Sequence, residues 1–141
     1  MTEELNLRLL DVLNSLADDL VAHLSADACS ISRVIGDVLI LVAEQVPAGV
    51  TLQSGQGYLV PDYPQTAEVL ATGTPRALTL DDPDADPGEA AILRTLGFSS
   101  LLMLPLELGG ARWGLIEVYR ANLRPFDGDD IRRAVELSRV D

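Results

Sequence analysis

The sequence contains no lysine, and it has only one cysteine and one histidine among its 141 residues. The lone cysteine, Cys29, excludes an intramolecular disulfide and a metal site with several thiolate ligands, and it agrees with a reducing compartment. Cys29 alternates with Ile31, which predicts a small buried side chain and not a catalytic or chromophore-linked thiol. His23 falls at the border of a helical stripe, which predicts a partly exposed histidine and not a haem ligand.

Residue patterns that carry catalysis, metal binding or phosphate binding are also missing. Residues 55–57, Gly-Gln-Gly, lack the strand-then-helix context of a dinucleotide site. The aspartates of the acidic loop 81–87 alternate like the start of a calcium loop, but Pro87 replaces the required glycine and Leu93 the bidentate glutamate. No nucleophile, base and acid form a recognisable set. We therefore expect no enzymatic activity, no catalytic residue, no metal site and no cofactor.

Positive charge is scarce as well. The sequence contains ten arginines and 22 aspartates and glutamates, which gives a formal net charge of −12. Phosphate groups would be repelled over most of such a surface. This balance predicts that nucleic acids and anionic lipids are not partners.

Long hydrophobic runs are absent. The uncharged, strongly apolar run 95–106 is far shorter than the roughly 20 residues that a membrane helix needs. The first residues are acidic and not basic, so no signal peptide is expected. Together these features predict a cytoplasmic protein without a membrane segment. With 48% apolar residues, the chain has the size of a single domain, residues 1–141.

A β-hairpin is the strongest structural pattern that is present. The apolar run 98–108 and the alternating run 112–119 flank Gly109-Gly110, and two glycines suit a tight hairpin turn. Both alternating sets of the first run are largely apolar, which predicts a central strand buried on both faces. Helices are therefore expected on both sides of the sheet.

The remaining elements follow from periodicity and from turn residues. We expect a leading helix Glu3–Leu24, a hairpin of 28–34 and 38–44, and a loop 47–63 with a brief extended piece at 57–60. The order continues with a helix 64–72 ended by Gly73, a strand 76–80, a helix 88–96 and a final helix after the N-cap Asp127.

Two segments then point to a known family. Residues 96–106, Leu-Gly-Phe-Ser-Ser-Leu-Leu-Met-Leu-Pro-Leu, and residues 124–130, Arg-Pro-Phe-Asp-Gly-Asp-Asp, resemble a GAF domain. The resemblance implies an α/β (α+β) fold with a central antiparallel sheet of five or six strands and helices on both faces. It also implies a leading helix in 1–25, a sheet and pocket region in 26–126 and a C-terminal helix in 127–141. The function implied is small-molecule or signal sensing without catalysis.

Activities of particular family members do not transfer. The cyclic-nucleotide signature keeps Asn122, Phe126 and Asp130, but Leu123 replaces its lysine and Ile131 its glutamate. We therefore expect no cyclic-nucleotide binding, with Asn122 and Asp130 in turn and cap roles and Phe126 in the core. The family's methionine-sulfoxide reductases need several cysteines, and its phytochrome-like members use a cysteine elsewhere in the domain.

A ligand site is expected under residues 58–80 and 88–96. Strand alternation puts Glu117 on one face with Trp113 and Tyr119, and a buried acid needs a partner. That partner is either an internal arginine, Arg33 or Arg76, or a donor group on a ligand. The candidate lining residues are mostly bulky and apolar, which favours a neutral or weakly polar ligand oriented by Glu117 or Arg76. They are Tyr58, Tyr63, Arg76, Phe98, Leu101, Met103, Trp113, Glu117 and Tyr119.

The leading helix carries more apolar surface than one domain usually covers. Its apolar residues span about half of the helical circumference over Glu3–Leu24. This width predicts a homodimer formed through the leading helix and the C-terminal helix. The alternative to a ligand sensor is a pocketless GAF-like scaffold that works by dimerisation or protein contact.

Overall fold

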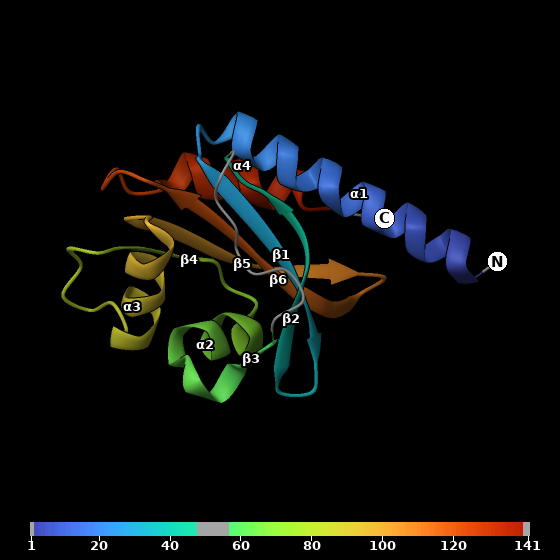
Figure 1. The fold of residues 1–141 in the computed structure, drawn as a ribbon, viewed down its shortest axis with the longest axis horizontal. Helices are drawn as coiled ribbons and strands as arrows, with labels where there is room; N and C mark the ends of the chain where they lie inside the picture. Colours follow the sequence, from blue (N-terminus) through green and yellow to red (C-terminus); the bar gives the residue numbers. More distant parts are fainter. Residues whose placement is uncertain (1, 48–56, 140–141) are drawn as a thin grey trace.

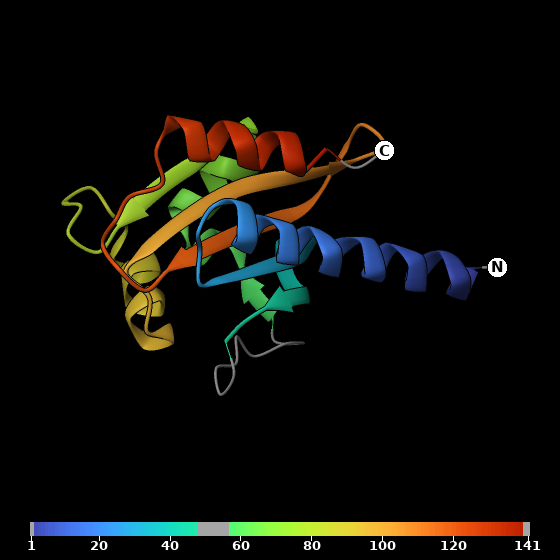
Figure 2. The same ribbon diagram turned by 90° about the horizontal axis from the view of Figure 1, so that it is seen from above.

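The computed structural model describes residues 2–47 and 57–139 and contains one six-stranded antiparallel sheet with the order β3-β2-β1-β6-β5-β4. Helices α1 and α4 cover one face, and α2 and α3 lie on the other (Figures 1 and 2). The α+β architecture with helices on both faces is therefore confirmed. The elements are α1 Thr2–His23, β1 Ala28–Ile35, β2 Val38–Gln45, β3 Gly57–Leu59, the 3-10 helix η1 Val60–Asp62, α2 Pro64–Thr72, β4 Arg76–Thr79, α3 Pro87–Leu96, β5 Ser100–Leu108, β6 Ala111–Arg120 and α4 Gly128–Leu137.

The predicted hairpins form as expected. Gly109 and Gly110 join β5 to β6, and both adopt positive φ, which suits a tight hairpin turn. Gly36 does the same between β1 and β2. Strand β5 lies between β4 and β6 and is buried on both faces along most of its length. The expectation of a central strand covered by helices is confirmed.

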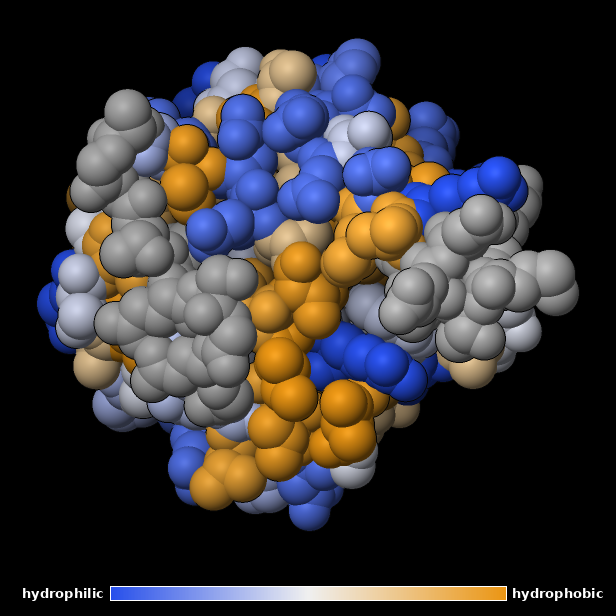
Figure 3. All heavy atoms as spheres, turned by 45° about the vertical axis from the view of Figure 1, so that its right-hand side comes forward, coloured by the Kyte–Doolittle hydropathy of each residue, from blue (hydrophilic) through white to orange (hydrophobic). Residues whose placement is uncertain are grey.

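The N-terminal half of α1 extends past the edge of the sheet (Figures 1 and 2). Leu7, Leu10 and Val12 on this half are exposed. The space-filling view turned toward this end shows a band of apolar surface across the molecule (Figure 3). Apolar side chains here lack a covering element among the described residues.

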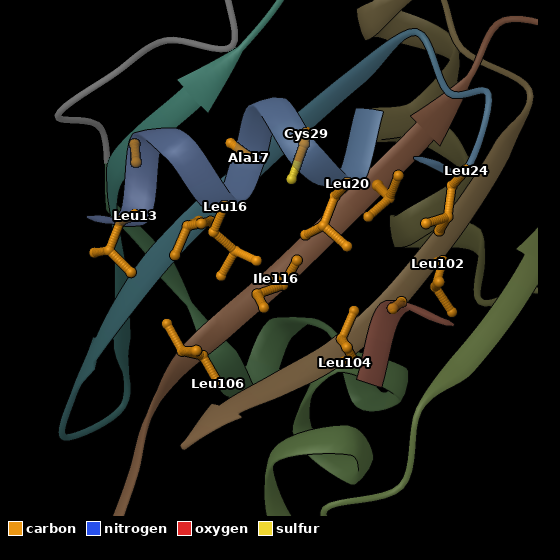
Figure 4. Close-up of a cluster of buried hydrophobic side chains, with 14 of the residues drawn as sticks. Leu13, Leu16, Ala17, Leu20, Leu24, Cys29, Leu102, Leu104, Leu106 and Ile116 are labelled. Atoms are coloured by element: carbon orange, nitrogen blue, oxygen red, sulfur yellow. The ribbon is translucent and has the colours of Figure 1, made fainter. Parts of the chain in front are cut away.

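The C-terminal half of α1 packs on the sheet and forms the first core. Leu13, Leu16 and Leu20 of the helix, and Leu24 directly after it, point toward the strands (Figure 4). They meet residues of β1, β5 and β6 that include Cys29, Leu102, Leu104, Leu106 and Ile116. Burying a leucine side chain contributes about 1.5–3 kcal/mol, so this row fixes the helix to the sheet.

Helix α4 lies beside α1 on the same face (Figure 2). Asp127 caps it by accepting a hydrogen bond from the backbone N–H of Asp130, and the Asp130 side chain accepts one from the N–H of Asp127. This capping box satisfies two otherwise unpaired donors at the start of the helix. Phe126 and Ala134 join the first core.

The opposite face carries a second core under α2 and α3. Val69 of α2 and Leu93 of α3 pack with residues of the sheet, including Leu78, Leu101 and Met103. Both helices end at glycines in the left-handed conformation, Gly73 and Gly97, as their sequence predicted. The second core does not fill all the space beneath these helices.

Candidate functional site

A cavity of about 50 Å³ lies on the α2 and α3 face of the sheet. Strands β1, β2 and β6 form its floor, and β3, α2, α3 and the residues that join them form its walls. It is lined by Ser30, Ser32, Leu39, Leu41, Tyr58, Tyr63, Thr66, Glu89, Ile92, Leu96, Glu117 and Tyr119. Since one water needs about 10–15 Å³ of such a cavity, the space suits a molecule of about four non-hydrogen atoms.

Strand pairing explains which side chains reach the floor. Ser30 of β1 pairs with Glu117 of β6 and also with Glu44 of β2, so the three lie in one row across the sheet. Glu117 pairs on its other side with Met103 of β5. Directly opposite residues of antiparallel strands point to the same face. The row therefore puts the Glu117 carboxyl between a serine and a methionine, with no cation beside it in the row.

The Glu117 carboxyl is the most perturbed acid of the site. Its pKa is raised to about 8, mainly by burial and also by the charge of Glu89, while a hydrogen bond from Tyr119 acts in the opposite direction. Burial disfavours the charged form of a carboxyl that no cation compensates. Glu117 is accordingly protonated for the most part near neutral pH.

Glu89 contributes the second carboxyl from the first turn of α3. It is buried, and its Oε1 accepts a hydrogen bond from the hydroxyl of Thr66 on α2. Burial raises the pKa of Glu89, while the bond from Thr66 lowers it and the nearby Asp86 raises it. Two carboxyls from different elements thus face one small cavity.

Three tyrosines surround these acids. The Tyr119 hydroxyl lies 3.4 Å from Ser30 Oγ, and its ring stacks on Phe98 with the centroids 5.0 Å apart. Tyr58 and Tyr63 meet edge to face with the centroids 6.3 Å apart. Burial raises the pKa of each tyrosine, and the charge of Glu117 adds to this for Tyr58 and Tyr119. The hydroxyls therefore remain neutral donors and acceptors.

Raising the pH toward 8 is expected to lower the free energy of unfolding through Glu117. Its pKa lies at about 8 in the folded protein against an ordinary value of 4.5, so the folded state binds more protons between these values. The stability contributed by the neutral form is fully present below about pH 4.5 and is lost as the pH rises through about 8. Glu117→Gln stays neutral and should lose this part of the pH dependence in urea denaturation.

A matched control for that measurement is Glu136→Gln, because Glu136 is exposed on α4 at the opposite face. It makes the same change in net charge and should keep the wild-type pH dependence. A Glu117→Gln profile parallel to the wild type would show that Glu117 is already ionised at low pH.

Four of the nine predicted site residues line the cavity: Tyr58, Tyr63, Glu117 and Tyr119. Phe98, Leu101 and Met103 belong to the second core beneath and beside it. Met103 contacts the site indirectly, since its sulfur lies 3.4 Å from the Thr66 hydroxyl. Eight of the twelve lining residues carry a hydroxyl or a carboxyl, so the lining holds more polar groups than the sequence predicted.

Trp113 lies on the other face of the sheet and packs against the first core. A bulge explains this, because the register of β5 and β6 shifts between Leu106 and Glu107, opposite Arg112 and Gly114. An extra residue in one strand reverses which face the next side chains occupy. The prediction assumed regular alternation from Glu117 to Trp113, and it therefore assigned Trp113 to the wrong face.

The predicted arginine partners of Glu117 are also wrong. Arg33 lies over the ring of Trp113, 5.6 Å from its centroid, on the α1 face. Arg76 is separated from Glu117 by Met103 in the row across the sheet, and it pairs instead with Glu68 of α2 at 3.8 Å. The residues that line the cavity include no arginine and no histidine.

Sequence reasoning missed Ser30, Ser32, Thr66 and Glu89. The alternation of the serines with Cys29 and Ile31 contained the signal for the first two, because it places them together on the opposite face. Glu89 occupies the first turn of a helix, where an acid usually interacts with the helix dipole, and this conceals a buried role.

The expectations for Cys29, Asn122, Asp130 and Phe126 are confirmed. Cys29 is buried in the first core, and burial raises the pKa of its thiol. Asn122 accepts a turn hydrogen bond from the N–H of Arg124, Asp130 completes the capping box and Phe126 is buried. Within residues 2–47 and 57–139, no cluster of three or more His, Cys, Asp and Glu side chains could hold a metal ion. In the same ranges, no helix is long and apolar enough to cross a bilayer.

The family model described as GAF domain matches residues 8–140. The chain belongs to the GAF family. GAF domains are generally non-catalytic sensory modules, so this domain is a sensory and signalling module by family. A search of curated protein sequences found no significant match.

Solved GAF structures share this fold. The blue-light absorbing form of the Thermosynechococcus elongatus PixJ GAF domain superimposes with a TM-score of 0.82 at 22% identity, covering 98% of this chain and 84% of that one. The phycocyanobilin-bound GAF domain of a cyanobacterial phytochrome gives 0.75 at 19%, covering 96% and 84%. The GAF domain of a two-component sensor histidine kinase from Bacillus halodurans gives 0.74 at 19%, covering 91% and 86%.

Proposed function

We propose that this GAF domain senses a small molecule in the cavity lined by Glu117, Glu89 and the three tyrosines. The observation that supports the proposal is the convergence of two carboxyls and several hydroxyls on one cavity at the centre of the sheet. Small-molecule sites typically combine an apolar wall with a few such groups. The volume of about 50 Å³ is well below the roughly 300–1,000 Å³ of sites for drug-sized ligands, so the ligand is small.

A bilin chromophore, as in the cyanobacterial structures, does not fit this chain. The cavity is far too small for an open-chain tetrapyrrole. Cys29, the only cysteine of the sequence, is buried in the first core on the opposite face of the sheet from Glu117. A thiol in that place does not reach the cavity. We therefore assign no light-dependent chemistry to the domain.

The strands offer a direct route from the cavity to α1. In β1, Ser30 and Ser32 line the cavity, while Cys29 and Ile31 contact the α1 core. Strand β6 has the same arrangement, with Glu117 on one side and Ile116 on the other. Because close-packed interiors transmit small displacements, a ligand that moves these strands also displaces the leading helix.

A fragment screen by NMR tests the sensing proposal. Amide shifts of the full chain should change at Ser30, Thr66 and Glu117 on addition of small polar fragments, with saturation. Ser32→Leu is expected to weaken these responses, because it adds apolar volume to the cavity floor. If no fragment moves these amides, the pocketless scaffold becomes the better description.

The second part of the proposal is a homodimer through α1 and α4. Its support is the exposure of Leu7, Leu10 and Val12 on a helix that extends past its own domain. Leu16, by contrast, belongs to the core of its own domain and is a poor probe of an interface.

Cytoplasmic localisation and the absence of a nucleic-acid partner remain predictions from composition and charge.

The double variant Leu7→Glu, Leu10→Glu is expected to convert a dimer into a folded monomer. Each change puts a charge on the exposed apolar surface of α1 and costs little in the monomer, because both side chains are exposed there. Multi-angle light scattering gives the mass, and circular dichroism checks the fold. A wild-type protein that is monomeric at high micromolar concentration would remove the dimer from the proposal.

A further inference from the structure

The polar groups of the cavity are unbalanced in charge. Glu117 and Glu89 both face it, while the lining residues include no positively charged side chain. The remaining polar lining groups are hydroxyls, from Ser30, Ser32, Thr66 and the tyrosines. An anion would therefore meet two acids and no cation, and a neutral ligand would not compensate the carboxylate form of either acid.

Three arginines in or beside the strands have other partners. Arg76 pairs with Glu68, Arg33 lies over Trp113 on the far face, and Arg120 pairs with Asp130. None of them can neutralise Glu117 without breaking an existing contact. A cation that pairs with the carboxylate form of Glu117 is therefore expected to come from outside the chain.

We infer that the ligand of this cavity is a small organic cation that donates hydrogen bonds from nitrogen, of the amidinium, guanidinium or alkylammonium class; this inference rests on the proposed function. Nitrogen donors suit carboxylate acceptors, and charge-assisted bonds of this kind are about twice as strong as neutral ones. The rings of Tyr58, Tyr63 and Tyr119 offer π faces to a cation. The net charge of −12 attracts cations toward the domain.

The size of the cavity and the protonation of its acids agree with this class. About four non-hydrogen atoms fit, as in acetamidinium, H₃C–C(NH₂)₂⁺. In the free protein the neutral form of Glu117 is favoured, since burial raises its pKa to about 8. A bound cation favours the carboxylate, so binding releases a proton to the solvent near neutral pH.

The other charged groups around Glu117 do not reverse this expectation. Glu89 of α3 and the tyrosines Tyr58, Tyr63 and Tyr119 face it across the cavity, and Glu44 of β2 lies in its row. Arg76 lies beyond Met103 in that row, paired with Glu68. Cys29 of β1 faces the opposite core. The affinity for a cation should therefore rise with pH as Glu117 loses its proton.

Three probes of the same shape and size test the inference: acetamidinium, neutral acetamide and anionic acetate. The full chain is titrated with each by NMR at several pH values. Acetamidinium is expected to shift the amides of Ser30, Thr66 and Glu117 and to bind about tenfold or more tightly than acetamide, with no saturable binding of acetate. Its affinity should rise from about pH 6 to about pH 9, with proton release measured by calorimetry in two buffers.

Two variants separate the cavity from the acidic surface. Glu117→Gln keeps the shape of the side chain and should weaken acetamidinium about tenfold while leaving acetamide unchanged. Glu136→Gln removes the same charge from the exposed face of α4 and should change neither. Equal or tighter binding of acetamide or acetate, an unchanged affinity in Glu117→Gln, or shifts spread over the acidic surface would overturn the inference.

Two outcomes of these titrations separate the cation inference from the proposed sensing function. If acetamidinium does not bind while neutral or anionic fragments move the cavity amides, the cation class is wrong and the sensing proposal stands. If neither the three probes nor the wider fragment set moves these amides, both are wrong.

Discussion

Gly114→Ala is expected to destabilise the domain by about 3 kcal/mol or more, a large part of the 5–15 kcal/mol that keeps a typical domain folded. A Cβ at Gly114 would lie 2.1 Å from the backbone oxygen of Ser32 and 3.4 Å from the Cα of Arg33. Both atoms belong to the backbone of β1, which pairs with β6 at this point. A rotamer change cannot relieve the clash, so the two strands would have to separate.

The same substitution should also disturb the candidate site. Ser32 is one of the serines that β1 presents to the cavity, and its register partner on β6 is Leu115, next to Gly114. A displaced β1 would move Ser30 and Ser32 away from Glu117. We expect the amide resonances of the cavity to shift in any fraction of the variant that folds.

Gly128→Ala is the matched control. Gly128 is the first residue of α4, its Cβ would meet no atom within 4 Å, and its backbone does not require positive φ. Alanine is favoured over glycine in a helix by up to about 1 kcal/mol, so this variant should be as stable as the wild type or slightly more stable. Urea denaturation compares the two. A loss of less than about 1 kcal/mol in Gly114→Ala would mean that β1 and β6 can move apart at low cost.

The elements were predictable because their signals are local. Gly36, Gly73, Gly97 and the pair Gly109-Gly110 all adopt the positive φ that ends a helix or turns a hairpin, and their sequence positions marked those ends. The N-cap Asp127 likewise begins α4. The conformation at such positions depends on a few neighbouring residues, so the residue types in the sequence are enough to predict it.

The site was predictable only in part because its residues come together through register and topology. Tyr119 and Glu117 were found since they share a regular stretch of β6, whereas the bulge before Gly114 moved Trp113 to the other face. The partner of Arg76 is Glu68, and that depends on where α2 packs against β4. Glu89 reaches Thr66 from a separate helix, a contact that no periodicity encodes.

Arg120 connects several parts of the structure, although no sequence pattern marked it. It is the last residue of β6, and only 1% of its surface is exposed. Its guanidinium donates to the backbone oxygens of Leu24 and Pro125, the latter at 3.0 Å, and lies 3.3 Å from Asp130 Oδ2. It also lies 4.0 Å above the ring of Phe126. One side chain thus joins the end of α1, the loop before α4 and the first turn of α4.

Arg120→Met is therefore expected to cost about 3–5 kcal/mol, because it removes the cation beside the Asp130 carboxylate and leaves buried backbone oxygens without their donor. The loss should be largest at α4, since its first turn is held by Asp130. Urea denaturation measures the total, and hydrogen exchange should show faster exchange of the α4 amides than of those in β5 and β6.

Arg132→Met provides the comparison within the same helix. Arg132 pairs with Asp129, but both side chains are largely exposed, at 68% and 78%. Exposed pairs contribute about 0–1 kcal/mol, so this variant should remain close to the wild type. If both arginine variants lose the same small amount, the Arg120 cluster does not hold α4 in place. If Arg120→Met alone releases α4, the Arg120 guanidinium is what connects α1 to α4. These are the two helices through which we propose that the domain dimerises.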